Sequence, residues 1–274
     1  MARKLFCEIC PFTYRLSVEK EILKRHLSDC FRGVRFAKQR TQDSLSVVIY
    51  RHKSLIRRRL GNVDMQLQDN KAVNLALAVT HIDGVLIRPG ETFSVWKLIG
   101  RTTASRGYKE GLTIAHGKPS KGIGGGMCQL SNLIHWMMLH SDLTITEHHH
   151  HDGIDLFPDN GRQIPFGTGT SISYNYIDYR VTNNTSNTYQ LRLWVNEEYL
   201  CGELLATDVL PHAFHIHAEN EYFSQENGIV YRNGQVYRDV LDRSTGRVLD
   251  CQLLRTNHAR VMYECPPSMV VREK

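Results

Sequence analysis

The stretch Gly124-Gly125-Gly126-Met127-Cys128-Gln129, with the apolar run that follows it to residue 141, decides how the centre of this chain folds. Three consecutive glycines let the backbone turn sharply and pass close to a ligand, because glycine tolerates conformations that other residues avoid. The residues that recur at helical spacing after this turn are Leu130, Leu133, Ile134, Met137 and Met138. We therefore expect a buried helix over residues 128–141, with the cysteine at its N-terminus.

Cys128 stands where a helix activates a thiol. The first N–H groups of a helix have no intrahelical partners, and the positive end of the helix dipole favours the thiolate. We expect Cys128 to attack a carbonyl carbon, while the backbone N–H groups of Gly126 to Gln129, with the Gln129 side chain, stabilise the developing oxyanion. Gly124 and Gly125 would let an extended peptide substrate pass. The alternative is a small buried cysteine in a helix core.

Four consecutive histidines, His148 to His151, offer a base for this cysteine. The segment Leu143-Thr144-Ile145-Thr146 predicts a strand that leads into them. Side chains alternate between the two faces of a strand, so the first and third histidines share one face and the second and fourth share the other. Only part of the run can therefore face the cysteine, and a surface loop is the alternative interpretation of the run.

The second and fourth of these histidines, His149 and His151, are the candidate general bases, and His149 is preferred. In cysteine enzymes of this kind a polar residue on a neighbouring strand orients the imidazole. Asp178, on a later predicted strand, and Glu147 are the candidates for this role. Together with Cys128 these residues predict a site for nucleophilic catalysis.

Hydrophobic periodicity predicts the elements on the N-terminal side of the site. An amphipathic helix is expected over residues 11–40, and a second helix over 70–82. Residues 85–87 and 92–96 are expected to form a hairpin or paired strands. Residues 100–126, rich in Gly, Lys and Ser, are expected to be a surface loop over the site.

Alternating apolar residues predict strands over 171–182, 187–195 and 199–206, and antiparallel β-structure from residue 212 onward. The predicted fold class is therefore α+β. In it the cysteine-bearing central helix packs on antiparallel strands, in a papain-like order of parts. A basic helical arm precedes this unit, and a β-rich segment follows it.

We expect three parts: a basic helical arm over residues 1–60, a central domain over 61–206, and a β-rich C-terminal extension over 207–274. The arm holds 15 Lys and Arg against 5 Asp and Glu, whereas the remainder holds 19 against 23. Such an arm suits an anionic membrane surface, or it is a solvated helix without a partner. Nucleic acid is not expected, because interleaved aromatic residues and a recognition helix are missing.

The sequence also predicts a compartment. No apolar stretch approaches the roughly 20 residues that span a bilayer, and Glu8 and Arg15 interrupt the apolar core of any signal peptide. We expect a cytoplasmic protein, or one that is peripheral on the inner membrane face. Seven cysteines, an odd number, predict no disulfide framework. No cofactor is expected.

Metal binding is an alternative to nucleophilic catalysis. The zinc-ligand types near the N-terminus are Cys7, Cys10, His26 and Cys30. The last two are one helical turn apart in the predicted helix, where such pairs arise by chance. A second group consists of His212, His215 and His217. These alternate on a strand with no nearby cysteine and are interpreted as surface residues, so no metal ligand is assigned.

Four motifs carry a resemblance to a known family. They are Asp83-Gly84-Val85-Leu86-Ile87-Arg88-Pro89-Gly90-Glu91-Thr92-Phe93-Ser94, Gly107-Tyr108-Lys109-Glu110-Gly111, Gly124 to Gln129 with Ser131, and Glu147 with His149 and His151. By these motifs the chain resembles the VanW family, most specifically over residues 60–205. The stand-alone proteins of that family are similar in length and in their basic N-terminal arm.

The resemblance implies a function in the cell wall. Family members that carry this domain outside the cell are similar to cysteine L,D-transpeptidases, which would acylate the cysteine with a peptidoglycan stem peptide and pass it to an acceptor amine. By this resemblance Cys128 is the nucleophile and His149 or His151 is the base. The residues implied to bind substrate are Gly124, Gly125, Gly126, Ser131, Glu147 and Tyr108. The stand-alone type is associated with glycopeptide resistance.

The alternative within this resemblance is a non-catalytic or metal-binding module that holds a cell-wall precursor. Two positions depart from the family's pattern. His148 stands where Arg is usual, so we expect a pH-dependent contact to a substrate carboxylate. Gly169 stands where an Asp is common, which removes one residue that could orient the histidine. Phe93 and Trp96 either line the cleft with Tyr108 or belong to the core.

Overall fold

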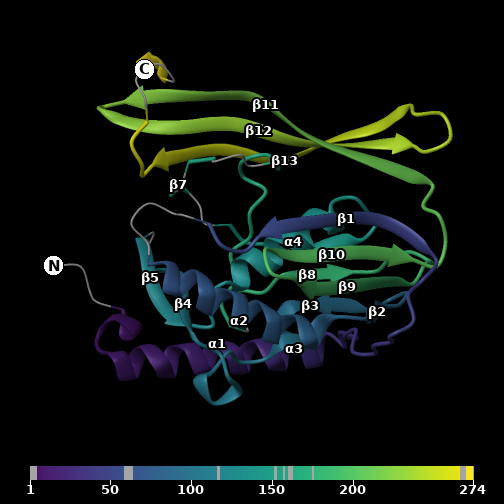
Figure 1. Cartoon of the computed structure of the whole chain (residues 1–274), viewed down its shortest axis with the longest axis horizontal. Helices are drawn as coiled ribbons and strands as arrows, with labels where there is room; N and C mark the ends of the chain where they lie inside the picture. Colours follow the sequence, from purple (N-terminus) through teal and green to yellow (C-terminus); the bar gives the residue numbers. More distant parts are fainter. Residues whose placement is uncertain are drawn as a thin grey trace.

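The structure is a computed structural model, and it describes residues 5–58, 64–115, 118–150, 153–156, 158–159, 163–174, 176–265 and 270–273. Its described part mixes helices with mostly antiparallel sheets, so the α+β fold class is confirmed. Figure 1 shows α1, α2 and α3 on one side of the molecule, three long C-terminal strands running across the other, and α4 beside β1 and β10. The central sheet lies between these two layers.

The helices begin and end where local chemistry permits. Their bounds are α1 (Pro11–Phe31), α2 (Met65–Ile82), α3 (Val95–Ile99) and α4 (Met127–Met138), with short 3-10 helices η1 (Phe6–Glu8) and η2 (Ala104–Arg106). Pro11 suits the first position of α1, and Gly33, with φ +61°, follows its last turn. The predicted helix over 11–40 therefore ends early. Asp64 caps α2 by accepting a hydrogen bond from the Gln66 N–H at 2.9 Å.

The central sheet has four antiparallel strands in the order β1 (Val47–Leu55), β10 (Tyr199–Ala206), β9 (Tyr189–Val195) and β2 (Val85–Ile87). The predicted strands over 187–195 and 199–206 are confirmed. Because β1 pairs with β10 along its whole length, residues that we placed in the N-terminal arm form part of the central sheet. The expected boundary at residue 60 therefore does not separate this strand from the domain.

The helix with the cysteine lies directly on this sheet. The predicted helix over 128–141 is confirmed as α4, which packs on β10 and β1, while α2 packs on β9. Gly202 in β10 makes the close approach possible, since a Cβ there would lie 2.7 Å from Met137 Cε and 2.8 Å from Leu133 Cδ2. The position of α4 is thus set by side chains that fill the space above a glycine.

Two smaller sheets complete the body of the molecule. One is β3 (Thr92–Ser94), β8 (Arg180–Thr182) and β6 (Thr144–Glu147), and the other is the hairpin of β4 (Glu110–Ala115) and β5 (Lys118–Ile123). Two predictions are wrong here. The strands β2 and β3 do not pair with each other, because each joins a different sheet, and residues 100–126 contain a hairpin rather than only a loop. The predicted strand over 171–182 is shorter, and only β8 remains of it.

The C-terminal residues form a separate long sheet. Its strands, in spatial order, are β14 (Val270–Glu273), β11 (His212–Glu226), β12 (Ile229–Asp242), β13 (Val248–Val261) and β7 (Ile154–Asp155). The expected antiparallel pairing from residue 212 is confirmed for β11, β12 and β13, whereas β14 and β7 pair in parallel at the edges. Arg238 Nη2 donates to the Ser141 carbonyl oxygen at 2.5 Å and ties this sheet to the end of α4.

The core lies between α2, α4 and the central sheet. Its largest fully buried side chains include Tyr179, Tyr189, Phe93, Leu75, Leu130 and Ile134. Phe93 and Trp96, for which we left a cleft position open, are buried in this core. Among the described residues no helix is both long and apolar enough to cross a membrane. None of the seven cysteines is joined in a disulfide bond in the described part of the chain.

The N-terminal helix is fixed to the body by a buried group of charges. Arg180 of β8 forms a bidentate ion pair with Asp29 of α1, with Nη1–Oδ1 at 2.5 Å and Nη2–Oδ2 at 3.0 Å. Lys97 Nζ lies 3.6 Å from the same carboxylate. Arg25, one turn earlier on α1, pairs with Glu147 of β6. The segment that the sequence describes as a basic arm is thus docked through its own charges.

Removing one partner of this group should destabilise the whole fold. Asp29→Ala leaves the guanidinium of Arg180 buried with fewer partners, so we expect the free energy of unfolding to fall by about 3 kcal/mol. The matched control is Glu19→Ala on the same helix, whose ion pair with Arg101 is exposed and should contribute less than about 1 kcal/mol. Urea denaturation measures both, and equal losses would show that the docking charges do not support the fold.

Candidate functional site

The glycine turn before α4 is held by protein on every described side. Gly124 and Gly126 have φ values of +82° and +111°, which an L side chain adopts only with strain. A Cβ on Gly125 would lie 2.5 Å from the carbonyl carbon of Gly111, so two backbone segments touch there. The Asn74 amide of α2 donates to the Gly125 carbonyl oxygen at 2.9 Å. The expected path for a peptide over this turn is therefore filled by the β4–β5 hairpin.

Cys128 lies in the first turn of α4, as expected, but its thiol is not activated in this state. The residue is partly exposed, whereas its thiol is surrounded by protein. This burial raises the pKa of the thiol, and a hydrogen bond that Ile172 donates from its N–H to the sulfur offsets only part of the effect. The direction is opposite to the lowering that the helix dipole predicts. Desolvation is therefore the dominant influence on this cysteine.

The two polar neighbours of Cys128 on α4 hold the helix in place. Gln129 Nε2 donates to Ser54 Oγ and to the Leu55 carbonyl oxygen, both at 2.9 Å, and so joins α4 to β1. Its amide is not directed at the sulfur side of the turn. Ser131 is buried, bonds the Thr170 hydroxyl, and donates to the Cys128 carbonyl oxygen at 3.1 Å. Both contacts position the helix that carries the thiol.

Glu147 and His149 form the polar half of the site at the end of β6. His149 Nε2 lies 3.0 Å from Glu147 Oε1. The same oxygen accepts a hydrogen bond from the Asp178 N–H at 2.9 Å, while Oε2 pairs with Arg25 and lies 3.5 Å from Arg180 Nε. Each oxygen of this carboxylate is thus held by two groups. Of the two residues that we considered for orienting the histidine, Glu147 makes the contact.

This arrangement sets the protonation state of His149. Burial lowers the pKa of its imidazole, and the positive charge of Arg25 lowers it further. The ring is therefore neutral near neutral pH. Because an ionised carboxylate only accepts hydrogen bonds, we assign the ring proton to Nε2, facing Glu147. The unprotonated Nδ1 is then available to accept a proton, as a general base must.

Asp178 is occupied with other partners. Its carboxylate is fully buried and accepts hydrogen bonds from Ser94 Oγ at 2.5 Å, from the Tyr179 N–H at 2.8 Å and from Arg180 Nε at 3.0 Å. It reaches the histidine only through its N–H on Glu147. Asp178 therefore positions the residue that orients His149 and does not orient it directly.

Two consecutive residues, Ser171 and Ile172, contact the two segments that carry the cysteine and the histidine. The Ile172 N–H binds the Cys128 sulfur, and the Ser171 N–H donates to the His149 carbonyl oxygen at 2.7 Å. The segment at 171–172 thus connects the helix with the thiol to the chain that carries the imidazole. The ring of His148, in contrast, lies 4.1 Å from that of His135 on α4. The alternation expected in the histidine run is therefore present.

The other predicted residues are placed as follows. His151 lies outside the described residues. Tyr108 is buried beside the core, and its hydroxyl has no hydrogen-bond partner in the described part of the chain. A surface pocket of about 570 Å³ lies at the C-terminal end of α2, away from Cys128. Its lining residues are Arg40, Thr41, Gln42, Thr80 and Asp83.

The zinc alternative near the N-terminus is excluded by helix geometry. Cys10 precedes α1, whereas His26 and Cys30 lie near its other end. At 1.5 Å per residue, 16 helical residues separate Cys10 from His26 by about 24 Å, too far for one metal ion. Sequence reasoning also missed Arg25 and Arg180, which surround Glu147. These arginines pair with carboxylates in distant segments of the chain. Such pairs follow no fixed spacing in the sequence, so no motif reveals them.

Comparisons with known proteins were consistent with one family. Residues 70–205 match the family model described as VanW like protein. The chain is 33% identical over its full 274 residues to the Vancomycin B-type resistance protein VanW of Enterococcus faecalis (strain ATCC 700802 / V583), covering 99% of that protein. It is 28% identical over 126 residues to the uncharacterized protein YoaR of Bacillus subtilis (strain 168), which covers 45% of this chain and 39% of YoaR. No solved structure matches the chain.

The glycine turn should tolerate no side chain. In Gly126→Ala the new Cβ would lie 2.6 Å from Lys71 Cγ at a φ of +111°, so we expect a loss of about 2–3 kcal/mol in the free energy of unfolding. Gly246→Ala is the matched control, because Gly246 also has a positive φ, +70°, but open space around it. It should lose about 1 kcal/mol. A Gly126→Ala variant as stable as the control, by thermal unfolding, would contradict the packing described.

The raised pKa of Cys128 predicts slow alkylation. With iodoacetamide near neutral pH, Cys128 should react more slowly than Cys10, because burial raises the pKa of the first thiol and a backbone hydrogen bond involving Thr13 lowers that of the second. The rate at Cys128 should keep rising with pH beyond the ordinary thiol pKa of about 8.5. Peptide mapping by mass spectrometry separates the two sites. Faster alkylation of Cys128 than of Cys10 would show that Cys128 is a thiolate and would contradict the prediction.

Proposed function

Because this chain belongs to the VanW family, we propose that it acts in cell-wall metabolism and in resistance to glycopeptides such as vancomycin. We further propose that Cys128 transfers an acyl group from a peptidoglycan stem peptide or its precursor. The relative from Enterococcus faecalis supports the first statement, since its name refers to vancomycin resistance and it aligns along the whole chain. The second statement rests on the site itself.

One observation carries the chemical proposal: a single backbone segment binds both the thiol and the main chain of the candidate base. Ile172 holds the Cys128 sulfur, and Ser171 holds the chain at His149. This segment keeps the two chain stretches that carry the proposed reacting groups next to each other, and catalysis by proximity depends on such placement.

The proposed reaction has two steps. In the first, the Cys128 sulfur attacks the carbonyl carbon of a stem-peptide amide, a C–S bond forms, and the thiol proton passes through His149 to the leaving amine as the C–N bond breaks. In the second, an acceptor amine attacks the thioester carbon, and a C–N bond forms as the C–S bond breaks. The amine loses a proton, which returns to the sulfur. Both resting groups are neutral, so His149 acts as a general base during attack.

The surroundings of His149 suit this role. The Glu147 carboxylate accepts a hydrogen bond from the Nε2–H group of His149. It also stabilises the imidazolium that forms when Nδ1 is protonated. Arg25 and Arg180 form ion pairs with that carboxylate and hold it in place. First-turn N–H groups of α4 are the proposed donors to the oxyanion, since the Gln129 amide is bound to β1. We propose that this reaction takes place on the cytoplasmic side of the membrane. The Lys and Arg side chains of residues 1–60 that do not dock α1 would then contact an anionic membrane surface.

A second candidate function is binding of a cell-wall precursor without chemistry. It is favoured by the raised pKa of the Cys128 thiol and by the close packing around Gly125. In that case the site would hold the same class of ligand, and removal of the thiol would leave affinity unchanged.

Intact-mass spectrometry distinguishes the two functions. The full-length protein is incubated with disaccharide tetrapeptide muropeptides, and we expect a stem-peptide adduct on the wild type that Cys128→Ser lacks. Cys30→Ala, which removes an exposed cysteine on α1, is the matched control and should keep the adduct. An adduct on Cys128→Ser, or equal ligand affinity with no adduct on any protein, would overturn the acyl-transfer proposal.

The role of His149 is tested by the rate at which the stem-peptide adduct forms. His149→Ala should slow adduct formation about 10²- to 10⁴-fold, as expected when a general base is lost. Glu147→Gln should slow it less and shift its pH profile, because the imidazole loses the carboxylate that fixes its tautomer. His81→Ala, which removes a partly exposed histidine on α2, is the control. Unchanged rates in both site variants would assign the base to another residue.

A further inference from the structure

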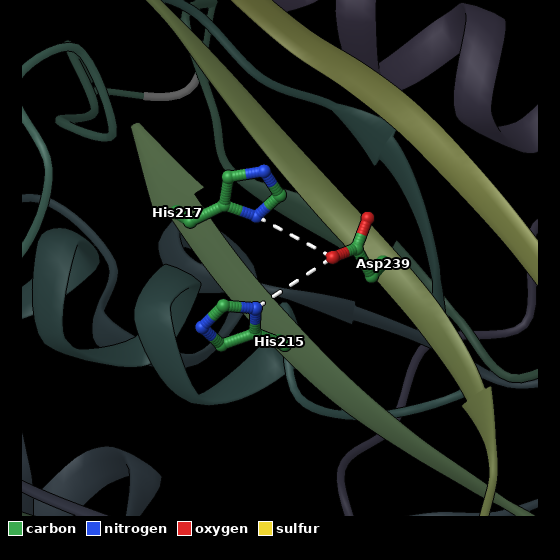
Figure 2. A group of neighbouring side chains, drawn as sticks. All are labelled: His215, His217 and Asp239. Carbon is green, nitrogen blue, oxygen red and sulfur yellow. Dashed lines mark ion pairs between the residues drawn. The ribbon is translucent and has the colours of Figure 1, made fainter. Parts of the chain in front are cut away.

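A separate group of metal-ligand side chains lies on the C-terminal sheet, away from Cys128. Figure 2 shows His215 and His217 of β11 directed at Asp239 of β12. Their ligand atoms all lie within 4.8 Å of one another. His215 pairs in register with Asp239, and His217 follows two residues on, so the three side chains share one face of the sheet. This group is distinct from the residues of the proposed acyl-transfer site.

The distances match those of a metal site. His215 Nδ1 lies 3.6 Å and His217 Nδ1 lies 3.5 Å from Asp239 Oδ2. Two ligand atoms at about 2.0–2.1 Å from a tetrahedral zinc ion are separated by about 3.4 Å. A hydrogen bond between these groups would be shorter than the observed distances. Both distances from the histidines to the carboxylate are therefore close to those expected for ligands of one zinc ion.

His217 carries a second, independent sign of a ligand. Its Nδ1 is buried and has no hydrogen-bond partner among the described residues. Its Nε2, on the opposite side of the ring, lies 3.2 Å from Glu219 Oε1. A histidine that binds a metal through one nitrogen commonly gives the other N–H to a carboxylate, which fixes the tautomer and the ring. His217 has this arrangement without the metal.

Cys251 of β13 is a further donor at the edge of this group, outside the set of ligand atoms that lie within 4.8 Å of one another. It pairs in register with Asp239, so its side chain lies on the same face, and its thiol hydrogen-bonds that carboxylate, which raises its pKa. The sequence showed no cysteine near these histidines, because Cys251 is brought there only by the pairing of β12 with β13. Two imidazoles, a carboxylate and a thiol are a donor set that suits Zn²⁺.

We propose that His215, His217 and Asp239, with Cys251 as the fourth ligand, bind one zinc ion on the outer face of the C-terminal sheet. The ion would connect three neighbouring strands, β11, β12 and β13. On binding, the thiol of Cys251 releases its proton to water, and both histidines bind in the neutral form.

The test uses the full chain, freed of metal by a chelator and dialysed, and titrated with Zn²⁺ or Co²⁺ alone. Competition with a chromophoric chelator measures zinc affinity, and the Co²⁺ spectrum reports tetrahedral geometry with a thiolate band. We expect His217→Ala and Asp239→Asn each to lose one equivalent of zinc per chain. Cys251→Ser should lose the thiolate band and bind zinc at least tenfold more weakly.

The matched control is His258→Ala, which removes a partly exposed histidine of the same sheet that lies 3.7 Å from Glu226. It should bind zinc as the wild type does, and circular dichroism checks that each variant is folded. Any zinc held by the run of histidines after β6 would be unaffected by all of these changes. Equal zinc stoichiometry and affinity in the wild type, His217→Ala and Asp239→Asn would overturn the proposal.

Discussion

The buried pairing of Arg180 with Asp29 is the interaction on which the rest of this structure depends. Both side chains are almost fully buried, so each charge requires the other. Through this pair the N-terminal helix is attached to the strand β8, and β8 in turn holds β3 and β6. The backbone of Asp178, two residues earlier, reaches Glu147 from the same strand end. One ion pair therefore fixes three chain segments that are far apart in sequence.

The chemical state of the candidate site follows from these charges. Arg25 and Arg180 keep Glu147 in position, and Glu147 accepts a hydrogen bond from the protonated nitrogen, Nε2, of His149. The positive charge of Arg25 and burial together lower the pKa of the imidazole, so that it is neutral and able to accept a proton. Burial acts on Cys128 in the opposite sense and keeps its thiol protonated. The proposed general-base mechanism requires two neutral groups of this kind, rather than a preformed ion pair.

The sequence predicted the parts of the fold that depend on local patterns. Apolar spacing located α4 and the central strands β9 and β10, because each buries one regular face. It failed where pairing is non-local: β2 and β3 each pair with a distant strand, and no short-range signal reveals that. The same limit applies to the site. Glu147 and His149 were found from a motif, whereas the roles of Arg25, Asp178 and Cys251 depend on contacts between distant segments.

The central claim is that the charge network holds His149 neutral, with its proton on Nε2. Long-range ¹H–¹⁵N NMR of the histidine side chains tests it most directly, with His149→Gln used to identify the signals of this ring. The account predicts a neutral imidazole protonated at Nε2 near neutral pH, and loss of that preference in Glu147→Gln. A ring protonated at Nδ1, or an imidazolium at the same pH, would contradict it.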